Sequence, residues 1–300
     1  MHKKGVVIPF FDYNSSNAIE SDTVSSENEM GITREKESFE ETLTRHDEFF
    51  VNMSHELKTP LNVIFSAIQL MEMSLTNDEK GENRSIVLNS IFSIKQNCYR
   101  LTKLINNIID LSKIDAGNLK LNISDVNIVE LIENIVQISS RYIKVKNLKI
   151  IFDTNVEKKV IACDYEKIER IVLNLISNAV KFSHDRGTIF VNVLDKGDSV
   201  EVSVKDNGIG IDEQSLANIF NRFGIVDKSL SRVAEGSGMG LSLVKSMVEL
   251  HGGTVSVQSK PGLGSIFKFE IPSKISFKQG NNDKMLNQEE ETMRIEFSDI

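Results

Sequence analysis

One of the five histidines in the chain lies in a setting that suggests chemistry, within the segment FFVNMSHELKTPLNVIF at residues 49–65. His55 is followed directly by Glu56, and Thr59 lies one helical turn further on the same face. On the heptad pattern of this segment His55 occupies an outward f position, whereas a histidine that fills a core lies at a or d. An exposed imidazole beside a carboxylate can attack a phosphoryl group, because the acid orients the ring and raises its nucleophilicity. A solvated helix surface is the alternative.

The segment ERIVLNLISNAVKFS at residues 169–183 predicts an amphipathic helix that carries a second polar set. Asn174 and Asn178 are four residues apart on one face, and Lys181 lies close to that face one turn later. Two amides and a cation can hold phosphate oxygens together with a hydrated Mg²⁺. Asparagine is a poor helix former, so two of them inside a helix favour a function, although a polar helix flank is the alternative.

The segment DNGIGI at residues 206–211 follows a predicted strand and suits a flat ligand. Asp206 at a strand end can accept a hydrogen bond from an exocyclic amine, and Gly208 and Gly210 allow the backbone to approach the ligand. The segment is not a dinucleotide-binding fingerprint, because the GxGxxG spacing and its βαβ setting are missing.

The segment EGSGMGLSLVK at residues 235–245 places three glycines before a predicted helix: Gly236, Gly238 and Gly240. Free N–H groups and the helix dipole at such a start suit a triphosphate. Residues 219–235, between the two glycine segments, are typical of a mobile lid, from which Arg222 could reach a phosphate. A further glycine pair lies in PGLGS at 261–265, where an ordinary hairpin turn is the alternative.

Hydrophobic periodicity predicts two long helices that present His55, over roughly residues 34–75 and 84–115. Each helix carries one apolar stripe, and an isolated pair cannot bury both stripes, whereas a dimeric four-helix bundle can. The heptads of the first helix stutter at Pro60, which predicts a bend there. Gly117 suits the C-terminal end of the second helix.

From about residue 119 the periodicity changes to short strand-like runs that alternate with helical segments. The predicted strands are LKLNIS, LKIIFDT, TIFVNVLD, SVEVSVKD, GTVSVQS and GSIFKFEIP, and the predicted helices lie near residues 127–146, 164–182 and 238–251. This order predicts an α/β sandwich with helices on one face of a mixed sheet. The predicted parts of the chain are a disordered segment (1–33), a helical dimerisation domain (34–118), an α/β domain (119–272) and a linker with a tail (273–300).

The amino-acid composition limits which partners and which location we expect for the chain. A formal charge of −8 over 300 residues argues against sequence-independent nucleic-acid binding, which requires a basic face. No apolar run approaches the roughly 20 residues that span a bilayer, so we expect no membrane span and a cytoplasmic location. Cys98 and Cys163 form no metal or redox motif, and we expect both to be reduced and buried.

The motif SHELKTPL strongly resembles the phosphoacceptor motif of the sensor histidine kinases of two-component systems, and the resemblance extends over about residues 40–272. It implies that His55 accepts the γ-phosphoryl group of ATP, that Glu56 assists proton removal, and that Thr59 positions water for the reverse, phosphatase reaction. It also implies a homodimer and an Asp on a separate response regulator as the phosphoryl acceptor, and it leaves room for a separate sensor protein as the input.

The other segments resemble the nucleotide-binding boxes of the same family, in the same order. Residues 169–183 resemble the N-box, in which Asn178 would be the Mg²⁺ ligand and Asn174 and Lys181 would contact phosphates. Residues 206–211 resemble the adenine-binding box, and the later glycine segments resemble the remaining boxes. The implied architecture is a helical hairpin followed by a Bergerat ATP-binding fold, with ATP and Mg²⁺ as cofactors.

The same fold occurs in type II topoisomerases, Hsp90-type chaperones and mismatch-repair ATPases, where a Glu one turn before the Mg²⁺-binding Asn activates water. Here Asn174 holds that place, and an amide cannot accept a proton, so ATP should be kept for His55. An ATP hydrolase or chaperone is therefore the weaker alternative. Another alternative is a non-catalytic dimer scaffold, or a kinase that acts mainly as a phosphatase through Thr59. The intact glycine boxes argue against the scaffold.

The segment TMRIEFSDI at residues 292–300 alternates apolar and polar residues with a period of two. This pattern predicts a strand that docks on a sheet edge or on a partner, since a single strand is not stable alone. A disordered tail is the alternative. Two further histidines, His184 and His251, are expected to be structural.

Overall fold

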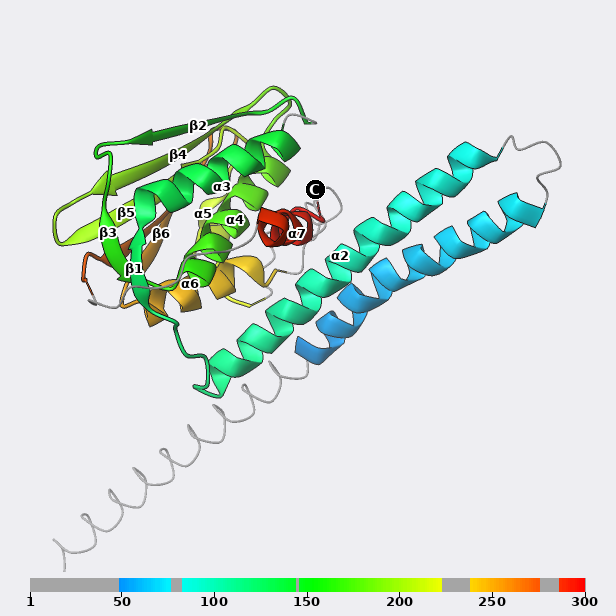
Figure 1. The fold of residues 1–300 in the computed structure, drawn as a ribbon, viewed down its shortest axis with the longest axis horizontal. Helices are drawn as coiled ribbons and strands as arrows, with labels where there is room; N and C mark the ends of the chain where they lie inside the picture. Colours follow the sequence, from blue (N-terminus) through cyan, green and yellow to red (C-terminus); the bar gives the residue numbers. More distant parts are fainter. Residues whose placement is uncertain (1–48, 77–82, 144–145, 223–237, 276–285, 300) are drawn as a thin grey trace, which may run out of the picture. The chain divides into compact units, whose positions relative to one another are not determined.

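The structure is a computed structural model that describes residues 49–76, 83–143, 146–222, 238–275 and 286–299 (Figure 1). The chain divides into two compact units, Met1–Ser54 and His55–Ile300, and the second unit holds the hairpin from His55 onward together with the sheets and their helices. The predicted disordered start, the upstream heptads and most of the lid lie outside the described residues, so these remain predictions. Among the helices of the described ranges, none is both long and apolar enough to cross a membrane.

Two antiparallel helices form the hairpin that carries His55, one over residues 49–76 and the other, α2, over Arg84–Asp115. The side-chain amide of Asn83 donates a hydrogen bond to the carbonyl of Ser74 (2.9 Å) and links their neighbouring ends. The first helix is assigned without a break through Pro60. Both predicted helices are confirmed within the described residues.

Each helix of the hairpin presents apolar side chains to solvent as well as to its partner helix. Leu61 and Phe65 on the first helix are 43% and 57% exposed, and Ile91 and Ile105 on α2 are each 48% exposed. Leaving so many large apolar side chains in water is unfavourable, and exposure of this kind favours an interaction surface. The observation agrees with the prediction that an isolated hairpin cannot bury both of its stripes.

The end of α2 and the two cysteines test three smaller predictions. Gly117 has a φ of +64°, and its N–H donates to the carbonyl of Ile114 (2.9 Å), so it ends α2 as predicted. Cys163 is fully buried, as predicted. Cys98 is exposed, so the prediction that it is buried is wrong; it lies seven residues from both Ile91 and Ile105, on the same solvent-facing side of α2.

The described residues of the second domain contain a five-stranded sheet in the order β2–β4–β5–β7–β6 and a two-stranded sheet of β1 and β3. The strands are β1 (Ser124–Asn127), β2 (Lys149–Thr154), β3 (Val160–Cys163), β4 (Thr188–Asp195), β5 (Ser199–Lys205), β6 (Thr254–Lys260) and β7 (Gly264–Pro272). In the larger sheet β2 and β4 are parallel, and the other neighbours are antiparallel. The predicted mixed sheet is confirmed.

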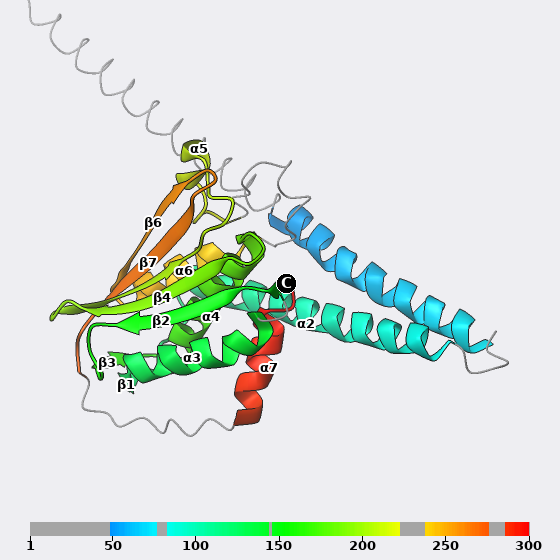
Figure 2. The ribbon, with the colours of Figure 1, turned by 90° about the horizontal axis from the view of Figure 1, so that it is seen from above.

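Three helices cover one face of the five-stranded sheet: α3 (Ile128–Ile143), α4 (Tyr165–Phe182) and α6 (Gly240–Leu250) (Figure 2). Alternate residues of β4 and β5 are buried beneath them, as expected of a sheet with one covered face. The apolar side of α4 is almost completely buried, as predicted: Ile171, Val172, Leu175, Ile176, Ala179 and Val180. A short helix, α5 (Glu213–Leu216), follows β5.

Two local predictions about strands at the start of this domain are wrong. The segment LKLNIS at residues 119–124 is not a strand, because β1 begins only at its last residue and continues to Asn127. The partner of β1 is the four-residue strand β3, which the sequence pattern did not predict. So short a strand carries too few residues to show a period.

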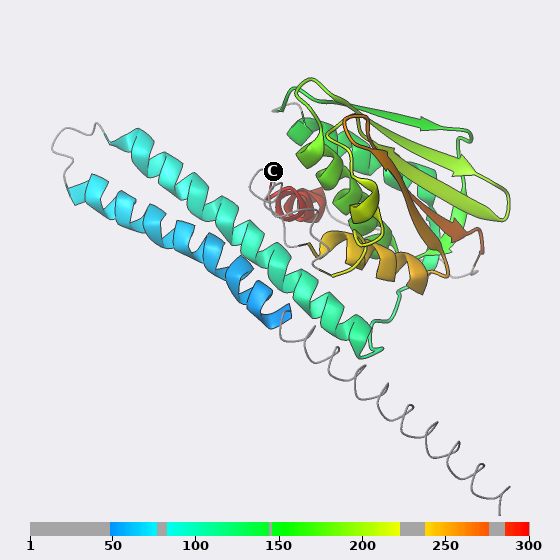
Figure 3. The ribbon, with the colours of Figure 1, turned by 180° about the vertical axis from the view of Figure 1, so that it is seen from behind.

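The predicted C-terminal strand is also wrong, because residues Leu286–Glu296 form helix α7 (Figure 3). Met293 and Phe297 alternate with polar residues in the sequence, but they are also four residues apart and therefore share one helical face. Both side chains are buried. Three consecutive glutamates at residues 289–291 are good helix formers. The tail does not add to a sheet edge and packs instead against α2, α3 and α4.

Candidate active site

His55 lies on the outer surface of the first helix and is exposed, as the heptad pattern predicts. Thr59, one turn later, is also exposed, and its hydroxyl donates to the carbonyl of His55 (3.2 Å). Glu56 is half-buried. The imidazole is therefore open to a second reactant, and a carboxylate and a hydroxyl lie within one turn of it.

Of the polar residues predicted on α4, Asn174 lies where that helix meets the start of α6. Asn174 is 5% exposed, and its side-chain amide donates to the carbonyl of Arg170 (2.9 Å). A Cβ added to Gly240 would lie 2.7 Å from Oδ1 of Asn174, so the backbone of α6 begins in close contact with that amide. Asn178 and Lys181 follow on α4 and are half-buried. The structure thus brings the first amide of the N-box and the third glycine together.

The start of α6 has backbone groups suited to an anion. Gly238 has a φ of +63°, and Gly240 is the first residue of the helix. Met239 in the N-cap position supplies no side-chain hydrogen bond to the free N–H groups. Those groups and the positive end of the helix dipole can bind phosphate oxygens. Gly236, the first of the three predicted glycines, lies outside the described residues.

Asp206 follows β5 and is 4% exposed. Its Oδ1 accepts hydrogen bonds from the N–H groups of Gly208 (2.8 Å) and Ser265 (3.3 Å). Burial raises the pKa of this carboxyl, and the two N–H groups oppose that shift. Both bonds use Oδ1, so the exocyclic amine of a base fits Oδ2 as its acceptor. Sequence reasoning did not name Ser265 as a site residue; its place at the end of the last glycine segment, PGLGS, was the available signal.

The loop after Asp206 requires glycine at two positions for reasons of packing as well as binding. A Cβ on Gly208 would overlap the carbonyl oxygen of Phe182 at the end of α4. Gly210 has a φ of +70°, and a Cβ there would overlap the carbonyl oxygen of Lys260 at the end of β6. The adenine-binding box is therefore held between α4 and the β6–β7 turn, which fixes Asp206 at the edge of the site.

Arg222 forms a paired contact with Asp115 at the end of α2. Its Nη1 donates to Oδ2 of Asp115 (2.6 Å), and its Nη2 donates to Oδ1. The carboxylate raises the pKa of the guanidinium. The lid from residue 223 onward lies outside the described residues, so the contact of Arg222 with phosphate stays a prediction, and Asp115 competes for the same side chain.

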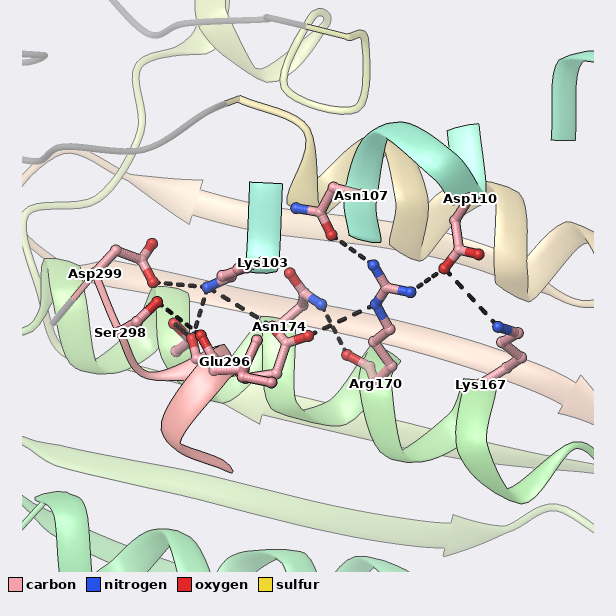
Figure 4. Close-up of polar contacts among 11 residues, drawn as sticks. Lys103, Asn107, Asp110, Lys167, Arg170, Asn174, Glu296, Ser298 and Asp299 are labelled. Atoms are coloured by element: carbon pink, nitrogen blue, oxygen red, sulfur yellow. Dashed lines mark hydrogen bonds and ion pairs between the residues drawn. The ribbon is translucent and has the colours of Figure 1, made fainter. Parts of the chain in front are cut away.

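Sequence reasoning missed a polar cluster that joins α2 to α4 (Figure 4). Arg170 of α4 donates to Asp110 and to Oδ1 of Asn107 (2.5 Å), and both of these residues are buried on α2. Lys167 also approaches Asp110 (3.8 Å). Asn107 and Asp110 are three residues apart within the largely apolar run INNIIDL, which was a usable signal for a helix face that meets a polar partner. Arg170 lies within the N-box segment and precedes Asn174 by one turn, so the cluster reaches the predicted phosphate-binding residues.

His251 is a half-buried structural residue, as predicted. Its Nδ1 donates to the carbonyl of Met247 (2.7 Å), and its Nε2 accepts from the N–H of Asp164 (3.1 Å). This pattern requires the neutral ring, and burial lowers the pKa of the imidazole. Asp164 in turn caps α4 by accepting from the N–H of Lys167 (3.1 Å). His184 is exposed, in the turn that follows α4.

Comparison with protein families identifies both parts of the chain. Residues 45–117 match the family described as the His Kinase A (phospho-acceptor) domain. Residues 163–275 match the family described as the histidine kinase-, DNA gyrase B- and HSP90-like ATPase. The first match includes His55 and the hairpin, and the second includes α4 and all of the predicted nucleotide-binding boxes.

Similar whole proteins are much longer than this chain. The circadian input-output histidine kinase CikA of Synechococcus elongatus is 34% identical over 227 residues, which are 75% of this chain and 30% of CikA. The autoinducer 2 sensor kinase/phosphatase LuxQ of Vibrio cholerae is 32% identical over 255 residues, which are 83% of this chain and 29% of LuxQ. The chain therefore spans less than a third of the length of these relatives.

Solved structures show the same fold. The crystal structure of full-length ShkA in complex with AMPPNP has a TM-score of 0.55 and 25% sequence identity to this chain. The match covers 75% of this chain and 46% of ShkA. One solved structure therefore matches three quarters of this chain in its fold.

Proposed function

Because the chain belongs to the sensor histidine kinases of two-component systems, we propose that it transfers the γ-phosphoryl group of ATP to His55. The observation that carries this proposal is that one chain has both an exposed imidazole, that of His55, and a helix that begins at glycine in close contact with Asn174. One group can receive a phosphoryl group, and the other can hold the nucleotide that supplies it.

In the proposed step, a ring nitrogen of His55 forms a bond to the γ-phosphorus while the bond to the β–γ bridging oxygen breaks and ADP leaves. Glu56, the next residue, assists removal of the proton from the ring. The phosphoryl group then passes to an Asp on the receiver domain of a separate response regulator. An exposed imidazole suits both transfers, because either reactant can approach it from solvent.

The nucleotide is proposed to lie along α4 and the start of α6. Asn178 is the Mg²⁺ ligand, and Asn174 and Lys181 contact the phosphates together with the N–H groups that follow Gly238. The described residues contain no group of three or more His, Cys, Asp or Glu that could hold a metal ion. An amide oxygen with phosphates and water is a usual environment for Mg²⁺, so this donor set fits the ion. Mg²⁺ would neutralise phosphate charge during transfer.

Asn174 also explains why the γ-phosphoryl group of ATP should be transferred to His55 and not to water. An ATPase of this fold needs a general base one turn before the metal-binding amide, and Asn174 cannot accept a proton. The close approach of Gly240 leaves little room for water beside Oδ1 of Asn174. We therefore favour a kinase over an ATP hydrolase or a chaperone.

We infer that the chain acts as a homodimer through the exposed apolar side of its hairpin, which includes Leu61, Phe65, Ile91 and Ile105. We also propose phosphatase activity toward the response regulator through Thr59, whose hydroxyl is exposed one turn from His55. The similar protein LuxQ is named a kinase/phosphatase, which supports this second activity.

Incubation with γ-³²P-labelled ATP and Mg²⁺ tests the proposal. The expected label is stable in base and labile in acid, as a phosphoramidate is, and His55→Gln abolishes it while nucleotide binding is retained. Asn178→Ala should reduce nucleotide affinity in Mg²⁺ and leave the weaker metal-free affinity unchanged. Label on the His55→Gln protein would refute the assignment.

A further inference from the structure

The C-terminal clasp, defined as α7 with residues 297–299, is anchored on α3 of the ATP-binding domain. Met293 and Phe297 face α3 and are 1% and 6% exposed. The sulfur of Met293 lies 3.8 Å from the hydroxyl of Ser139, and the ring of Phe297 stacks on Tyr142 with centroids 5.7 Å apart. Burial of two large side chains on one helical face stabilises a specific packing of this short helix on α3.

The other side of the clasp is bound to α2 of the hairpin (Figure 4). Gln96 and Arg100 both donate to the carbonyl of Ser298, at 3.0 and 2.8 Å. The ammonium group of Lys103 donates to a carboxylate oxygen of Asp299 (2.7 Å), and both side chains are partly buried. The clasp therefore ties the hairpin and the ATP-binding domain to each other.

The clasp also lies on the face of α4 that carries the N-box. Glu296 is 4% exposed, its carboxylate lies 3.6 Å from Nε of Arg170, and its carbonyl accepts from the hydroxyl of Ser177 (3.3 Å). Arg170, Asn174 and Ser177 follow one another at helical spacing on α4. The two α4 residues that the clasp contacts thus flank an amide proposed to bind phosphate.

The point where the clasp holds α2 is level with His55 along the hairpin. Asn83 is linked to Ser74, and His55 lies 19 residues before Ser74, so in an antiparallel pair it is level with about residue 102 of α2. Lys103, which binds the clasp, is the next residue.

We propose that the C-terminal clasp is an autoinhibitory contact that fixes the ATP-binding domain on α2 and must detach for the kinase to turn over. The inference rests on the proposed phosphorylation of His55. That imidazole must meet the γ-phosphate and later the response regulator, so the ATP-binding domain has to approach His55 and then withdraw from it. A tie between the two domains opposes both movements. If the clasp is docked 90–99% of the time, its release should raise the rate of autophosphorylation about 10- to 100-fold.

The test uses the full chain with Met293→Ala and Phe297→Ala together, and Glu291→Gln as the matched control on the exposed side of α7. The double variant should label His55 at least several-fold faster than wild type, and the control should not differ from wild type. Thermal unfolding and ATP affinity show whether the double variant is folded. An equal or slower rate in a folded double variant that binds ATP would overturn the proposal.

A second measurement separates docking from catalysis. The full-length Met293→Ala, Phe297→Ala variant is mixed with a fluorescent peptide of residues 286–299, and binding is followed by anisotropy, which needs no phosphoryl transfer. The peptide should bind and slow labelling of His55, whereas a peptide with Phe297→Ala should do neither. Binding without any change in rate overturns the inhibitory role alone. If no chain labels His55, the proposed function fails and the inhibitory role fails with it.

Discussion

Replacing Gly264 by alanine should damage the ATP-binding domain much more than replacing Gly262, although the two glycines are only two residues apart, in the β6–β7 turn (Gly262) and at the start of β7 (Gly264). Both have a positive φ, +85° for Gly264 and +75° for Gly262. Alanine at either position is forced into the left-handed region, at a cost of about 1–2 kcal/mol. The positions differ in their surroundings. A Cβ on Gly262 meets nothing within 4 Å, whereas one on Gly264 would overlap the carbonyl oxygen of Asp206 and lie 2.7 Å from Cα of Asn207.

The overlap at Gly264 can be relieved only if β7 and the end of β5 move apart. That movement breaks the hydrogen bond from the N–H of Asp206 to the carbonyl of Ser265 (2.9 Å). It also lengthens the bond from the N–H of Ser265 to the Asp206 carboxylate (3.3 Å). Overpacking and one lost bond add about 2–4 kcal/mol to the backbone strain. We therefore expect Gly264→Ala to lower the free energy of unfolding by at least about 2 kcal/mol more than Gly262→Ala does, or about 4–8 °C in Tm for a domain of this size.

Urea and thermal unfolding of the two variants, followed by circular dichroism, measure this difference directly. ATP affinity provides a second readout, because only Gly264→Ala displaces Asp206. Equal unfolding midpoints for the two variants would refute the argument from close approach. A strongly destabilised Gly264→Ala protein that keeps full ATP affinity would show that Asp206 is not the acceptor of the base.

Three further predictions concern buried titratable groups. Asp206→Asn should abolish ATP binding without lowering the free energy of unfolding. The amide oxygen still accepts from the backbone N–H groups, and the substitution removes a buried carboxylate whose pKa is raised by burial. Asp185→Asn, in an exposed turn, is the control, and a large loss of stability in Asp206→Asn would contradict the expectation. Folding lowers the pKa of His251, so below about pH 6.5 the unfolded chain binds more protons than the folded chain. The free energy of unfolding should therefore fall as the pH drops below that value. If His251→Gln shows the same dependence of stability on pH, other groups cause it. Burial raises the pKa of Cys163 to about 12, so a maleimide should reach Cys163 only after unfolding, as mass spectrometry of labelled peptides would show.

The parts of the fold that the sequence could predict are those whose pattern repeats over many residues. Helix α2 was predicted at its observed bounds because its apolar residues recur along most of its 32 residues and Gly117 marks its end. Strands β4, β5 and β7 were predicted because alternating residues face one covered side of the sheet. The short elements were not predictable in this way. β3 has four residues, and the apolar spacing of α7 satisfies both a strand and a helix.

In the candidate site, too, local patterns were predictable from the sequence and contacts between distant residues were not. His55 was placed on the outer surface by the heptad alone, and the structure confirms its exposure. The contact between Asn174 and Gly240 could not follow from spacing, because 66 residues separate them and only the packing of α6 on α4 brings them together. The ties of Arg170 to Asp110, and of Arg222 to Asp115, link α2 to the second domain and depend on how those parts pack. Periodicity carries no information about such pairs.

The contacts of the C-terminal clasp with α2 join residues 193 to 202 positions apart in the sequence. During synthesis the hairpin and the ATP-binding domain are complete before the last turn of α7 exists, and domains fold as they emerge. Closing so large a loop also costs entropy, so we expect the clasp to form last in refolding as well. A newly made chain would thus pass through an interval in which its hairpins can pair and ATP can bind before the clasp is in place. Pulsed hydrogen exchange during refolding should show protection at Met293 and Phe297 appearing after protection in α4; simultaneous protection would mean that the clasp belongs to the folding core.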